Sequence, residues 1–371
     1  MQTNCNMKKI ILTIFGALAA AGTLGATEEL RKNGRTGEKV EPEIRIETGT
    51  AGRQVDDTSK DEENGKTCRR MAVVELSSIY MRQEPDYESA LETQELMGTV
   101  VEIISKNRYW REIVSPQPYK AWTTAKGLVE MTDAQLQEYM AAPKVMFTGL
   151  YGNIYEEPSS KAATICNLVG GDVMRIAEET GRDARMKGKW TKVKLPSGKT
   201  GFVPTDDLRI YEGARSIAQG EGSAASVSPE TTEAIIADAE RLLGVPYLWG
   251  GMTSCGVDCS GLVRLCYLMN GIHLPRNASQ QFRCGEKVDI PADNRGGVAE
   301  TTIEKLERGD LLFFGTQPSD PEGKIRVTHV GIYLGKGKFI HASQLVRINS
   351  LISGRADHYE NSYKLVGAVR L

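Results

Sequence analysis

The sequence is poor in histidine, with four in 371 residues, and aromatic side chains make up only 6% of it. It also lacks an excess of charge, because 46 Lys and Arg stand against 48 Asp and Glu, for a formal net charge of −2. Without a basic excess, attraction to phosphates is weak, and we expect no nucleic-acid partner. Beyond the first thirty residues, no apolar run is long enough to span a bilayer. The length suits two or three globular domains.

The one long apolar run lies at the N-terminus. Lys8 and Lys9 precede "IILTIFGALAAAGTLGA", which ends in small residues and is followed by charged ones. This order is typical of a secretory signal peptide, here residues 1–26, and Met7 is an alternative start. The alternative interpretation is a buried strand or helix. We therefore expect an exported protein, periplasmic or secreted, with no membrane span once the signal is removed.

Cysteine is also scarce, with seven residues in the chain. Removal of the signal peptide removes Cys5 and leaves six, whose spacings do not resemble a disulfide framework. We expect mostly unpaired thiols in a chain of this size. Residues 27–70 are polar and charged, and this composition predicts a poorly ordered segment ahead of the first domain.

An internal repeat follows this polar segment. The marks of its first copy are Ile79, Tyr80, Pro85, Gly98, Val100, Trp110 and Trp122, and those of its second are Ile154, Tyr155, Pro158, Gly171, Val173, Trp190 and Phe202. Short alternating runs between the marks, bounded by turn residues, predict strands. Residues 71–143 and 144–212 are therefore expected to form two small all-β barrels, with the large aromatic residues in their cores.

The last part of the chain has a different pattern. Residues 213–228 are rich in small residues, Gly and Ser, and predict a flexible linker. Residues 229–371 are expected to form one α+β domain. Its first helix begins at Pro229, stops before Gly244, and has this apolar face: Ile235, Ile236, Ala239, Leu242 and Leu243.

Three cysteines cluster in "GMTSCGVDCSGLVRLCYLMN". Asp258 is a good N-cap for a helix that carries Cys259 in its first turn and places Cys266 on its apolar stripe. Cys266 is therefore expected in the core. A zinc site would need two further ligands, and no second paired motif supplies them. A disulfide between Cys255 and Cys259 remains an alternative.

Cys259 has the setting of a nucleophile. The unpaired N–H groups and the dipole of a helix N-terminus favour a thiolate, and a thiolate needs a base nearby. Two of the four histidines, His329 and His341, lie on one predicted hairpin downstream. No role is expected for His273 or His358.

Six motifs in order, "VPYLWGG", "DCSGLV", "LPRNAS", "RGDLLFF", "HVGIYLG" and "FIHAS", resemble the NlpC-type family of peptidoglycan cysteine peptidases. The resemblance implies a papain-like fold for residues 229–371, with Cys259 as nucleophile, His329 as general base and acid, and His341 as the residue that orients it. It also implies an oxyanion site formed by the backbone N–H of Cys259 and the hydroxyl of Tyr247. No metal or other cofactor is implied. Trp249 is assigned to the core.

The two repeats resemble the bacterial SH3-like domains of a subgroup that hydrolyses the γ-D-glutamyl–L-diamino acid bond, the diamino acid being diaminopimelate or lysine. In that subgroup a tyrosine and an acid of the first SH3-like domain bind the free amine of an N-terminal L-Ala. Tyr119 matches the tyrosine. The position of the acid aligns with Ala90, which Glu88 and Glu92 flank.

Further substrate contacts follow from the same resemblance. Asp258 and Ser260 match substrate-binding positions, whereas Asn277 and Ala278 stand where the family often has Asp and Ser. We expect a monomeric enzyme acting on peptidoglycan peptides. Two alternatives remain: an endopeptidase of the intact sacculus with SH3-like wall anchors, and an inactive wall-binding protein.

The hairpin that carries the two histidines must place both on one face of the sheet. If Lys336 and Gly337 formed a regular two-residue loop, His341 would lie opposite Ile332 and the imidazoles would face opposite sides. A three-residue loop, residues 335–337, or a β-bulge between His329 and His341 restores the common face. We therefore predict one of these two irregularities.

Overall fold

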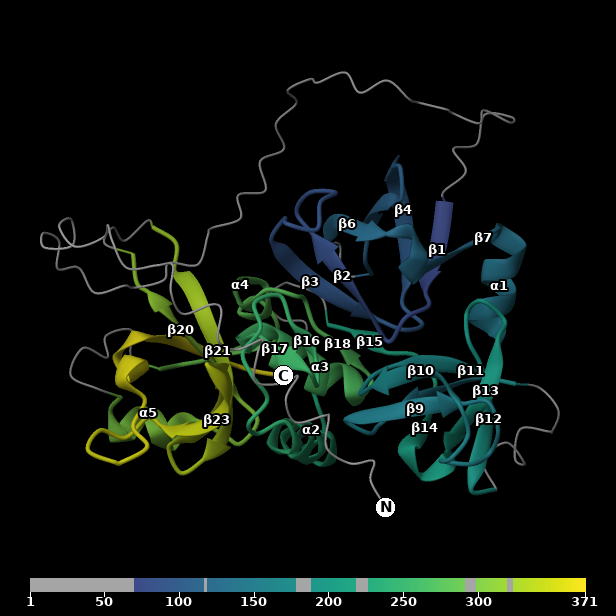
Figure 1. Ribbon diagram of the computed structural model, residues 1–371. Coiled ribbons are helices and arrows are strands. Elements are labelled where there is room, and N and C mark those ends of the chain that lie inside the picture. Colours follow the sequence, from purple (N-terminus) through teal and green to yellow (C-terminus); the bar gives the residue numbers. More distant parts are fainter. Residues whose placement is uncertain (1–69, 117–118, 178–187, 218–225, 291–297, 319–322) are drawn as a thin grey trace, which may run out of the picture. The chain divides into compact units, whose positions relative to one another are not determined.

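A computed structural model describes residues 70–116, 119–177, 188–217, 226–290, 298–318 and 323–371 (Figure 1). The predicted signal peptide, and the polar segment up to residue 69, lie outside the described residues. Among the described residues, no helix combines the length and the hydropathy that crossing a membrane requires.

The first all-β domain contains seven strands: β1 (Arg70–Val74), β2 (Ser78–Arg82), β3 (Leu91–Leu96), β4 (Val100–Asn107), β5 (Trp110–Val114), β6 (Lys120–Thr124) and β7 (Leu128–Met131). They form one sheet in the order β3-β2-β6-β5-β4-β1-β7. The short helix η1 (Ala125–Gly127) precedes β7, and α1 (Asp133–Ala141) follows it. Thr132 caps α1 by accepting from the backbone N of Gln135 at 3.3 Å.

The second all-β domain repeats this topology. Its strands are β8 (Lys144–Phe147), β9 (Tyr151–Tyr155), β10 (Thr164–Val169), β11 (Val173–Ile176), β12 (Trp190–Lys194), β13 (Thr200–Pro204) and β14 (Leu208–Tyr211), with η3 (Thr205–Asp207) before the last. Their order, β10-β9-β13-β12-β11-β8-β14, is that of the first domain shifted by seven strands. The register repeats too, since Trp110 pairs with Thr124 and Trp190 with Pro204. The internal repeat is thus a structural duplication.

The backbone conformation explains why both copies of the repeat have a glycine at one equivalent position. Gly98 and Gly171 occupy equivalent turns with φ of 85° and 95°, a conformation that glycine adopts without strain. The prediction of core aromatics holds for Trp110, which is 4% exposed, but Trp122 and Trp190 are only half-buried. The ring centroids of Trp190 and Tyr155 lie 5.6 Å apart in an edge-to-face arrangement, and both side chains are half-buried.

The C-terminal domain packs helices against an antiparallel sheet. The helices are α2 (Pro229–Arg241), α3 (Cys259–Met269), α4 (Ala278–Gln281), α5 (Glu300–Lys305) and η4 (Glu360–Lys364). The six-stranded sheet has the order β19-β24-β20-β21-β22-β23, from β19 (Glu286–Val288), β20 (Leu311–Thr316), β21 (Arg326–Gly335), β22 (Lys338–Ser343), β23 (Leu345–Ser350) and β24 (Leu365–Arg370). The predicted fold class, α+β with two all-β domains ahead of the C-terminal domain, is confirmed.

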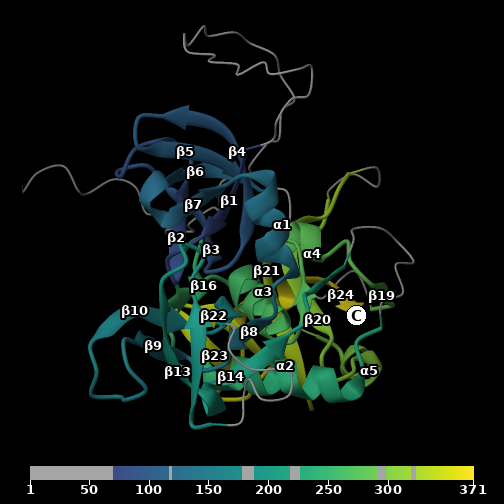
Figure 2. The same cartoon turned by 90° about the vertical axis from the view of Figure 1, so that its right-hand side faces the viewer.

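Short strands complete the domain: β15 (Arg215–Ser216) pairs with β18 (Ile272–His273), and β16 (Met252–Thr253) with β17 (Gly256–Val257). The N-terminus of α2 is as predicted, with Ser228 as N-cap and Pro229 in the first turn. Its predicted apolar face is buried except for Leu243, which is exposed. Helix α3 contacts α2 on one side and strands β21 and β22 on another, so its first turn is held in the interior (Figure 2).

Strand β3 of the first all-β domain bonds directly to the C-terminal domain. Thr93 Oγ1 accepts from Arg276 Nε at 2.7 Å, and Gln94 Oε1 accepts from the backbone N of Met252 at 2.8 Å. The next residue, Glu95, forms an ion pair with Arg264 of α3 at 3.2 Å. All three β3 side chains are buried. Breaking such a buried ion pair from one side typically costs about 3–5 kcal/mol, so this strand fixes the first domain next to α3.

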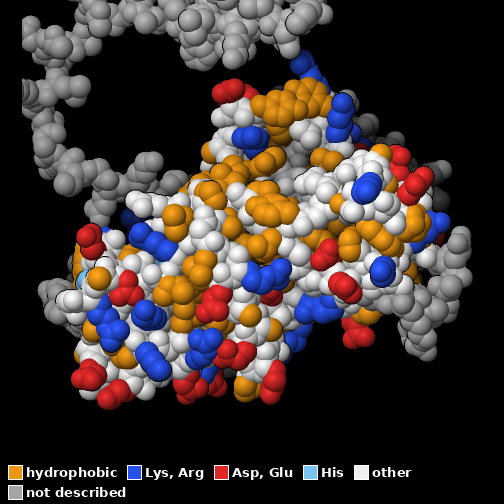
Figure 3. All heavy atoms as spheres, turned by 60° about the horizontal axis from the view of Figure 1, so that its bottom comes forward, with side chains coloured by type: hydrophobic (Ala, Val, Ile, Leu, Met, Phe, Trp, Pro, Cys, Tyr) orange, Lys and Arg blue, Asp and Glu red, His pale blue; other side chains and the backbone are white. Residues whose placement is uncertain are grey.

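Figure 3 shows one face of the molecule, on which basic and acidic side chains are interspersed with hydrophobic and uncharged ones. This mixture agrees with the nearly balanced composition of the chain.

Candidate active site

The hairpin β21–β22 brings His329 and His341 together. Gly335 pairs with Lys338, so the loop is the two-residue turn Lys336–Gly337, but Tyr333 pairs with Phe339 and a bulge at residue 334 intervenes. Ile332 consequently pairs with Ile340, and the same register puts His341 opposite residue 331, on the face of His329. The bulge alternative of our prediction is confirmed, and the three-residue loop is wrong.

A chain of hydrogen bonds fixes the two imidazoles. His329 Nε2 and His341 Nδ1 are 2.7 Å apart, and His341 Nε2 lies 2.9 Å from Asn349 Oδ1 on β23. Asn349 Nδ2 donates to the backbone O of Asp357 at 2.8 Å, so its Oδ1 faces the histidine as an acceptor. Neutral His341 must then carry its proton on Nε2, and its Nδ1 accepts from His329 Nε2. In neutral His329 this leaves Nδ1 with a free lone pair.

Burial and charge keep both rings neutral. Burial, followed by the neighbouring His341 and Arg347, lowers the pKa of His329 well below its ordinary value. Burial also lowers the pKa of His341 to about 4, although the hydrogen bond that His341 donates to Asn349 acts in the opposite direction. Near neutral pH the pair is therefore uncharged in the resting protein, with the base form of His329 available.

Cys259 begins helix α3. Asp258 is the N-cap, and its Oδ1 accepts from the backbone N of Gly261 at 2.7 Å. Cys259 is 5% exposed at the first turn, whereas Cys266 is 0% exposed in the core, as predicted. Cys255 is exposed, and within the described part of the chain no disulfide joins it to Cys259, so the disulfide alternative is wrong.

The helix and the hairpin converge through their common neighbours. Helix α3 packs on β21 and β22, and Cys259 belongs to the same core cluster as residues of both strands. The ring of Tyr359 lies 6.0 Å from that of His329. Burial raises the pKa of Tyr359 to about 12, and the charge of Cys259 makes a smaller contribution in the same direction. Tyr247 packs against this cluster and donates its backbone N–H to Gln344 O at 2.8 Å. The assigned oxyanion role of its hydroxyl stays a prediction.

A buried arginine that the sequence analysis did not single out holds Asp258. Arg276 Nη1 donates to Asp258 Oδ1 at 3.0 Å and to Ser260 Oγ at 2.9 Å, and Nη2 bonds Asp258 Oδ2. Asp258 also accepts from the backbone N of Gly250 at 2.9 Å. Burial disfavours the positive charge of Arg276, but the neighbouring Asp258 raises the pKa of Arg276. The carboxylate of Asp258 is thus occupied by the protein, and substrate contact by Asp258 and Ser260 stays a prediction.

The structure separates the two candidate acids of the first all-β domain. Tyr119 donates its hydroxyl to Glu92 Oε2 at 2.6 Å, and Glu92 also accepts from Gln83. Glu88 is exposed on the preceding turn. Burial, followed by the bond to Glu92, raises the pKa of Tyr119, and the charges of Arg276 and Asp258 act on it as well. Tyr119 and Glu92 therefore lie beside the pair that caps α3, and binding of a substrate amine by either acid stays a prediction.

Two other assignments need comment. Asn277 is the N-cap of α4, and its backbone N donates to Gln280 Oε1 at 3.2 Å, so it has a structural task at this position. The assignment of Trp249 to the core is wrong, since its side chain is 37% exposed. The two glycines that follow Trp249 pack closely on other backbone, Gly250 on Glu92 and Gly251 on Gly256, so neither position has room for a side chain.

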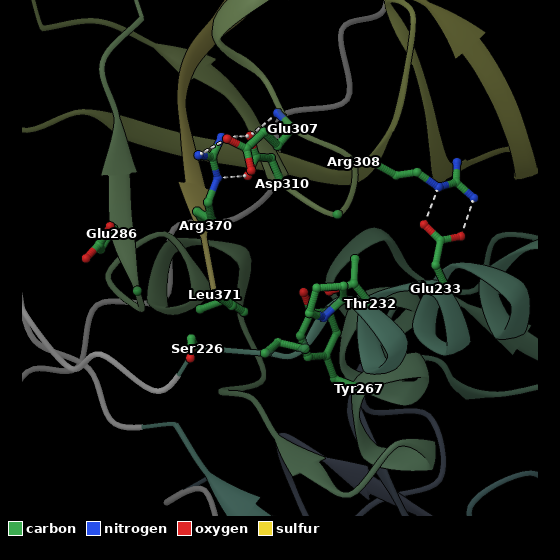
Figure 4. A pocket seen from close by; sticks show the side chains of 14 residues that line it. Ser226, Thr232, Glu233, Tyr267, Glu286, Glu307, Arg308, Asp310, Arg370 and Leu371 are labelled. Atoms are coloured by element: carbon green, nitrogen blue, oxygen red, sulfur yellow. Dashed lines mark hydrogen bonds and ion pairs between the residues drawn. The ribbon is translucent and has the colours of Figure 1, made fainter.

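A hollow of about 580 Å³ elsewhere in the domain is not this site (Figure 4). It opens between the start of α2 and the C-terminus. Its arginines are already paired, Arg308 with Glu233 at 2.6 Å and Arg370 with Asp310 at 2.8 Å. None of the predicted site residues lines it.

Comparisons with known proteins concern the domains and the fold. The NlpC/P60 family matches residues 244–364, and the bacterial SH3 domain matches residues 148–209. The crystal structure of an NlpC/P60 family protein from Bacillus cereus ATCC 10987 aligns with 81% of this chain and 99% of its own, with a TM-score of 0.60 and 22% identity. This likeness concerns the fold.

Two curated relatives cover most of the chain. The gamma-D-glutamyl-L-lysine dipeptidyl-peptidase of Bacillus cereus (strain ATCC 10987 / NRS 248) is 27% identical over 281 residues, 74% of this chain and 73% of that protein. Dipeptidyl-peptidase 6 of Lysinibacillus sphaericus is 26% identical over 285 residues, 76% of this chain and 91% of that protein. The chain therefore contains an NlpC/P60 family domain behind a bacterial SH3 domain, and it is a hydrolase of the cysteine peptidase class.

Proposed function

We propose that the protein hydrolyses the γ-D-glutamyl–L-diamino acid bond of peptidoglycan-derived peptides that begin with a free L-Ala. The diamino acid is diaminopimelate or lysine. The observation that supports this best is the Tyr119–Glu92 pair, at 2.6 Å, beside the Arg276–Asp258 pair that caps the helix of Cys259. An acid and a phenol at this place form a receptor for an ammonium group close to the nucleophile. The two relatives with dipeptidyl-peptidase names support the same choice.

The chemistry follows from the hydrogen-bond chain. His329 Nδ1 accepts the proton of the Cys259 thiol, and the thiolate attacks the γ-carbonyl of the D-glutamyl residue. The backbone N–H of Cys259 and the hydroxyl of Tyr247 stabilise the oxyanion. The imidazolium of His329 then protonates the leaving amine, and water releases the acyl group from Cys259 with His329 as base. Neutral His341 holds His329 in the productive tautomer throughout.

Recognition of the N-terminal ammonium group explains why the proposed product is a dipeptide. Glu92 accepts from Tyr119, and its charge is available for the ammonium group of L-Ala. A blocked N-terminus removes that positive charge and leaves the half-buried carboxylate without a counter-ion. The bonds from β3 to Arg276 and Met252 argue against a freely moving wall anchor in the first all-β domain, and thus against the sacculus endopeptidase. We propose that the enzyme acts after export, in the periplasm or outside the cell.

The test is product analysis by mass spectrometry. L-Ala-γ-D-Glu-diaminopimelate and its lysine analogue are each incubated with the enzyme, with a free and with an acetylated N-terminus. The proposal requires the dipeptide L-Ala-D-Glu from the free peptides only. Equal rates on free and acetylated peptides would support the sacculus endopeptidase, and the absence of any cleavage would support the inactive wall-binding protein.

Asn349 gives a prediction of its own. Asn349→Leu removes the acceptor for His341 Nε2–H, and we expect kcat to fall about 10- to 100-fold with little change in KM, because the tautomer of the pair is released. Asn349→Asp retains an acceptor and should retain more of the activity. Its added carboxylate raises the pKa of His341, and protonated His341 cannot accept from His329, so the acid limb of the kcat profile should move to higher pH. Steady-state kinetics between pH 4 and 8 measure both effects, and an unchanged kcat in Asn349→Leu would contradict this role.

A further inference from the structure

Arg347 lies next to the catalytic histidines on the edge strand β23. It pairs directly with His341 across β22–β23, and directly opposed residues of antiparallel strands point to the same side. Asn349, two residues further along β23, points to that side as well and bonds His341 at 2.9 Å. The side chain of Arg347 therefore emerges on the face of the sheet that carries the histidine pair.

The guanidinium of Arg347 has no partner within the described part of the chain. The side chain is half-buried, its Nε is shielded from solvent, and neither a hydrogen bond nor an ion pair of the described residues reaches it. Other arginines of the domain are paired: Arg264 with Glu95, and Arg276 with Asp258. A partly desolvated charge without a counter-ion is unfavourable, which singles out Arg347.

This lone charge acts on the reacting groups. It contributes to lowering the pKa of both His329 and His341, and so it opposes the imidazolium that forms during the reaction. An anion bound to Arg347 would remove that opposition whenever substrate is present. The planar fork of a guanidinium suits a carboxylate, which it can bind with two parallel hydrogen bonds.

We propose that Arg347 binds a carboxylate of the peptide substrate. This inference rests on the proposed function, because substrates of that class bear two suitable groups, the α-carboxylate of D-glutamate and the carboxylate of the leaving diamino acid. Glu92 and Tyr119 receive the cationic end of the peptide. The unpaired guanidinium beside the histidines then supplies the opposite charge for its anionic part. Arg276 cannot do so, because its donors are taken by Asp258, Ser260 and Thr93.

The test measures how the effect of substituting Arg347 depends on each carboxylate of the substrate. Three substrates are compared: L-Ala-γ-D-Glu-L-Lys, its analogue amidated at the D-glutamyl α-carboxylate, and its analogue amidated at the lysine carboxylate. The wild-type enzyme should lose about 10- to 100-fold in kcat/KM on one of the two amides. Arg347→Gln should show a similar loss on the unmodified peptide and no longer distinguish that amide from it. The amide affected identifies the carboxylate that is bound.

Controls keep the outcome interpretable. Arg347→Lys retains the charge without the fork and should keep part of the discrimination, while Arg308→Gln, in the same domain but paired with Glu233, should keep all of it. Circular dichroism checks folding of each variant. Equal kcat/KM on all three substrates in the wild type, or full discrimination in Arg347→Gln, would overturn the proposal. Failure of the wild type to cleave any of the three would instead overturn the proposed function.

Discussion

Cys259→Ala is expected to lower kcat/KM on L-Ala-γ-D-Glu-diaminopimelate by about 10⁴-fold or more, with the fold intact. The thiol supplies the only covalent bond of the proposed acyl-enzyme, and loss of a nucleophile in enzymes of this kind removes nearly all of the rate. Folding should be retained because the capping of α3 depends on Asp258 and its partners, not on the sulfur. Steady-state kinetics and thermal unfolding measure the two effects.

Cys266→Ala is the matched control. Cys266 lies two turns along the same helix, is 0% exposed, and belongs to the core cluster. Its truncation should lower the free energy of unfolding by about 1–2 kcal/mol and leave kcat nearly unchanged. Cys255→Ala, at an exposed position, should change neither. Activity that survives in Cys259→Ala and is lost in Cys266→Ala would refute the assignment of the nucleophile.

The second large effect is expected from Glu92→Gln. Glutamine keeps the shape and can still accept from Tyr119, but it removes the negative charge that faces the substrate ammonium. Truncating one member of a desolvated charge pair costs about 2–5 kcal/mol, so kcat/KM on peptides with a free N-terminus should fall about 10²-fold, mostly through KM. The ratio of rates on free and acetylated peptides should fall with it.

Glu88→Gln provides the control that the chain offers for this prediction. Glu88 lies four residues before Glu92, carries the same charge and is exposed on the turn ahead of β3. Its substitution should leave both rates unchanged within about twofold. If Glu88→Gln and Glu92→Gln behaved alike, long-range charge rather than a specific contact would explain the preference, and the proposed amine receptor would be abandoned.

The local parts of the fold could be predicted from the sequence. Asp258 ahead of an apolar stripe predicts a capped helix with Cys259 in its first turn, because caps and periodicity depend on residues close in the chain. The duplicated spacing around Trp110 and Trp190 predicts two similar all-β domains for the same reason, and the register of the strands repeats accordingly.

The hairpin shows where this reasoning reaches its limit. Alternation along a strand requires an irregularity between His329 and His341 if both are to face one site, and the structure contains one. The sequence could not choose between a longer loop and a bulge, because Gly335 and Gly337 allow either backbone. Alternation along β23 also predicts that Asn349 faces the same side of the sheet as Arg347, two residues earlier. Only the register of β23 against β22, however, places Asn349 beside His341.

Only the tertiary structure decided which side chains meet across domains. Thr93 and Arg276 are separated by 183 positions, and their hydrogen bond depends on how β3 docks against α3 and β16. The choice of Glu92 over Glu88 depends on the fold of the first all-β domain, which brings one carboxylate to Tyr119 and leaves the other in solvent. Each of these contacts joins two residues that lie far apart in the chain. Neither a hydrophobic periodicity nor a helix cap in the sequence therefore indicates them. The residues proposed as nucleophile and base were therefore predictable from local pattern and resemblance. The surroundings of the residues proposed to position the substrate were decided by packing, within the first all-β domain for Glu92 and between the domains for Arg276.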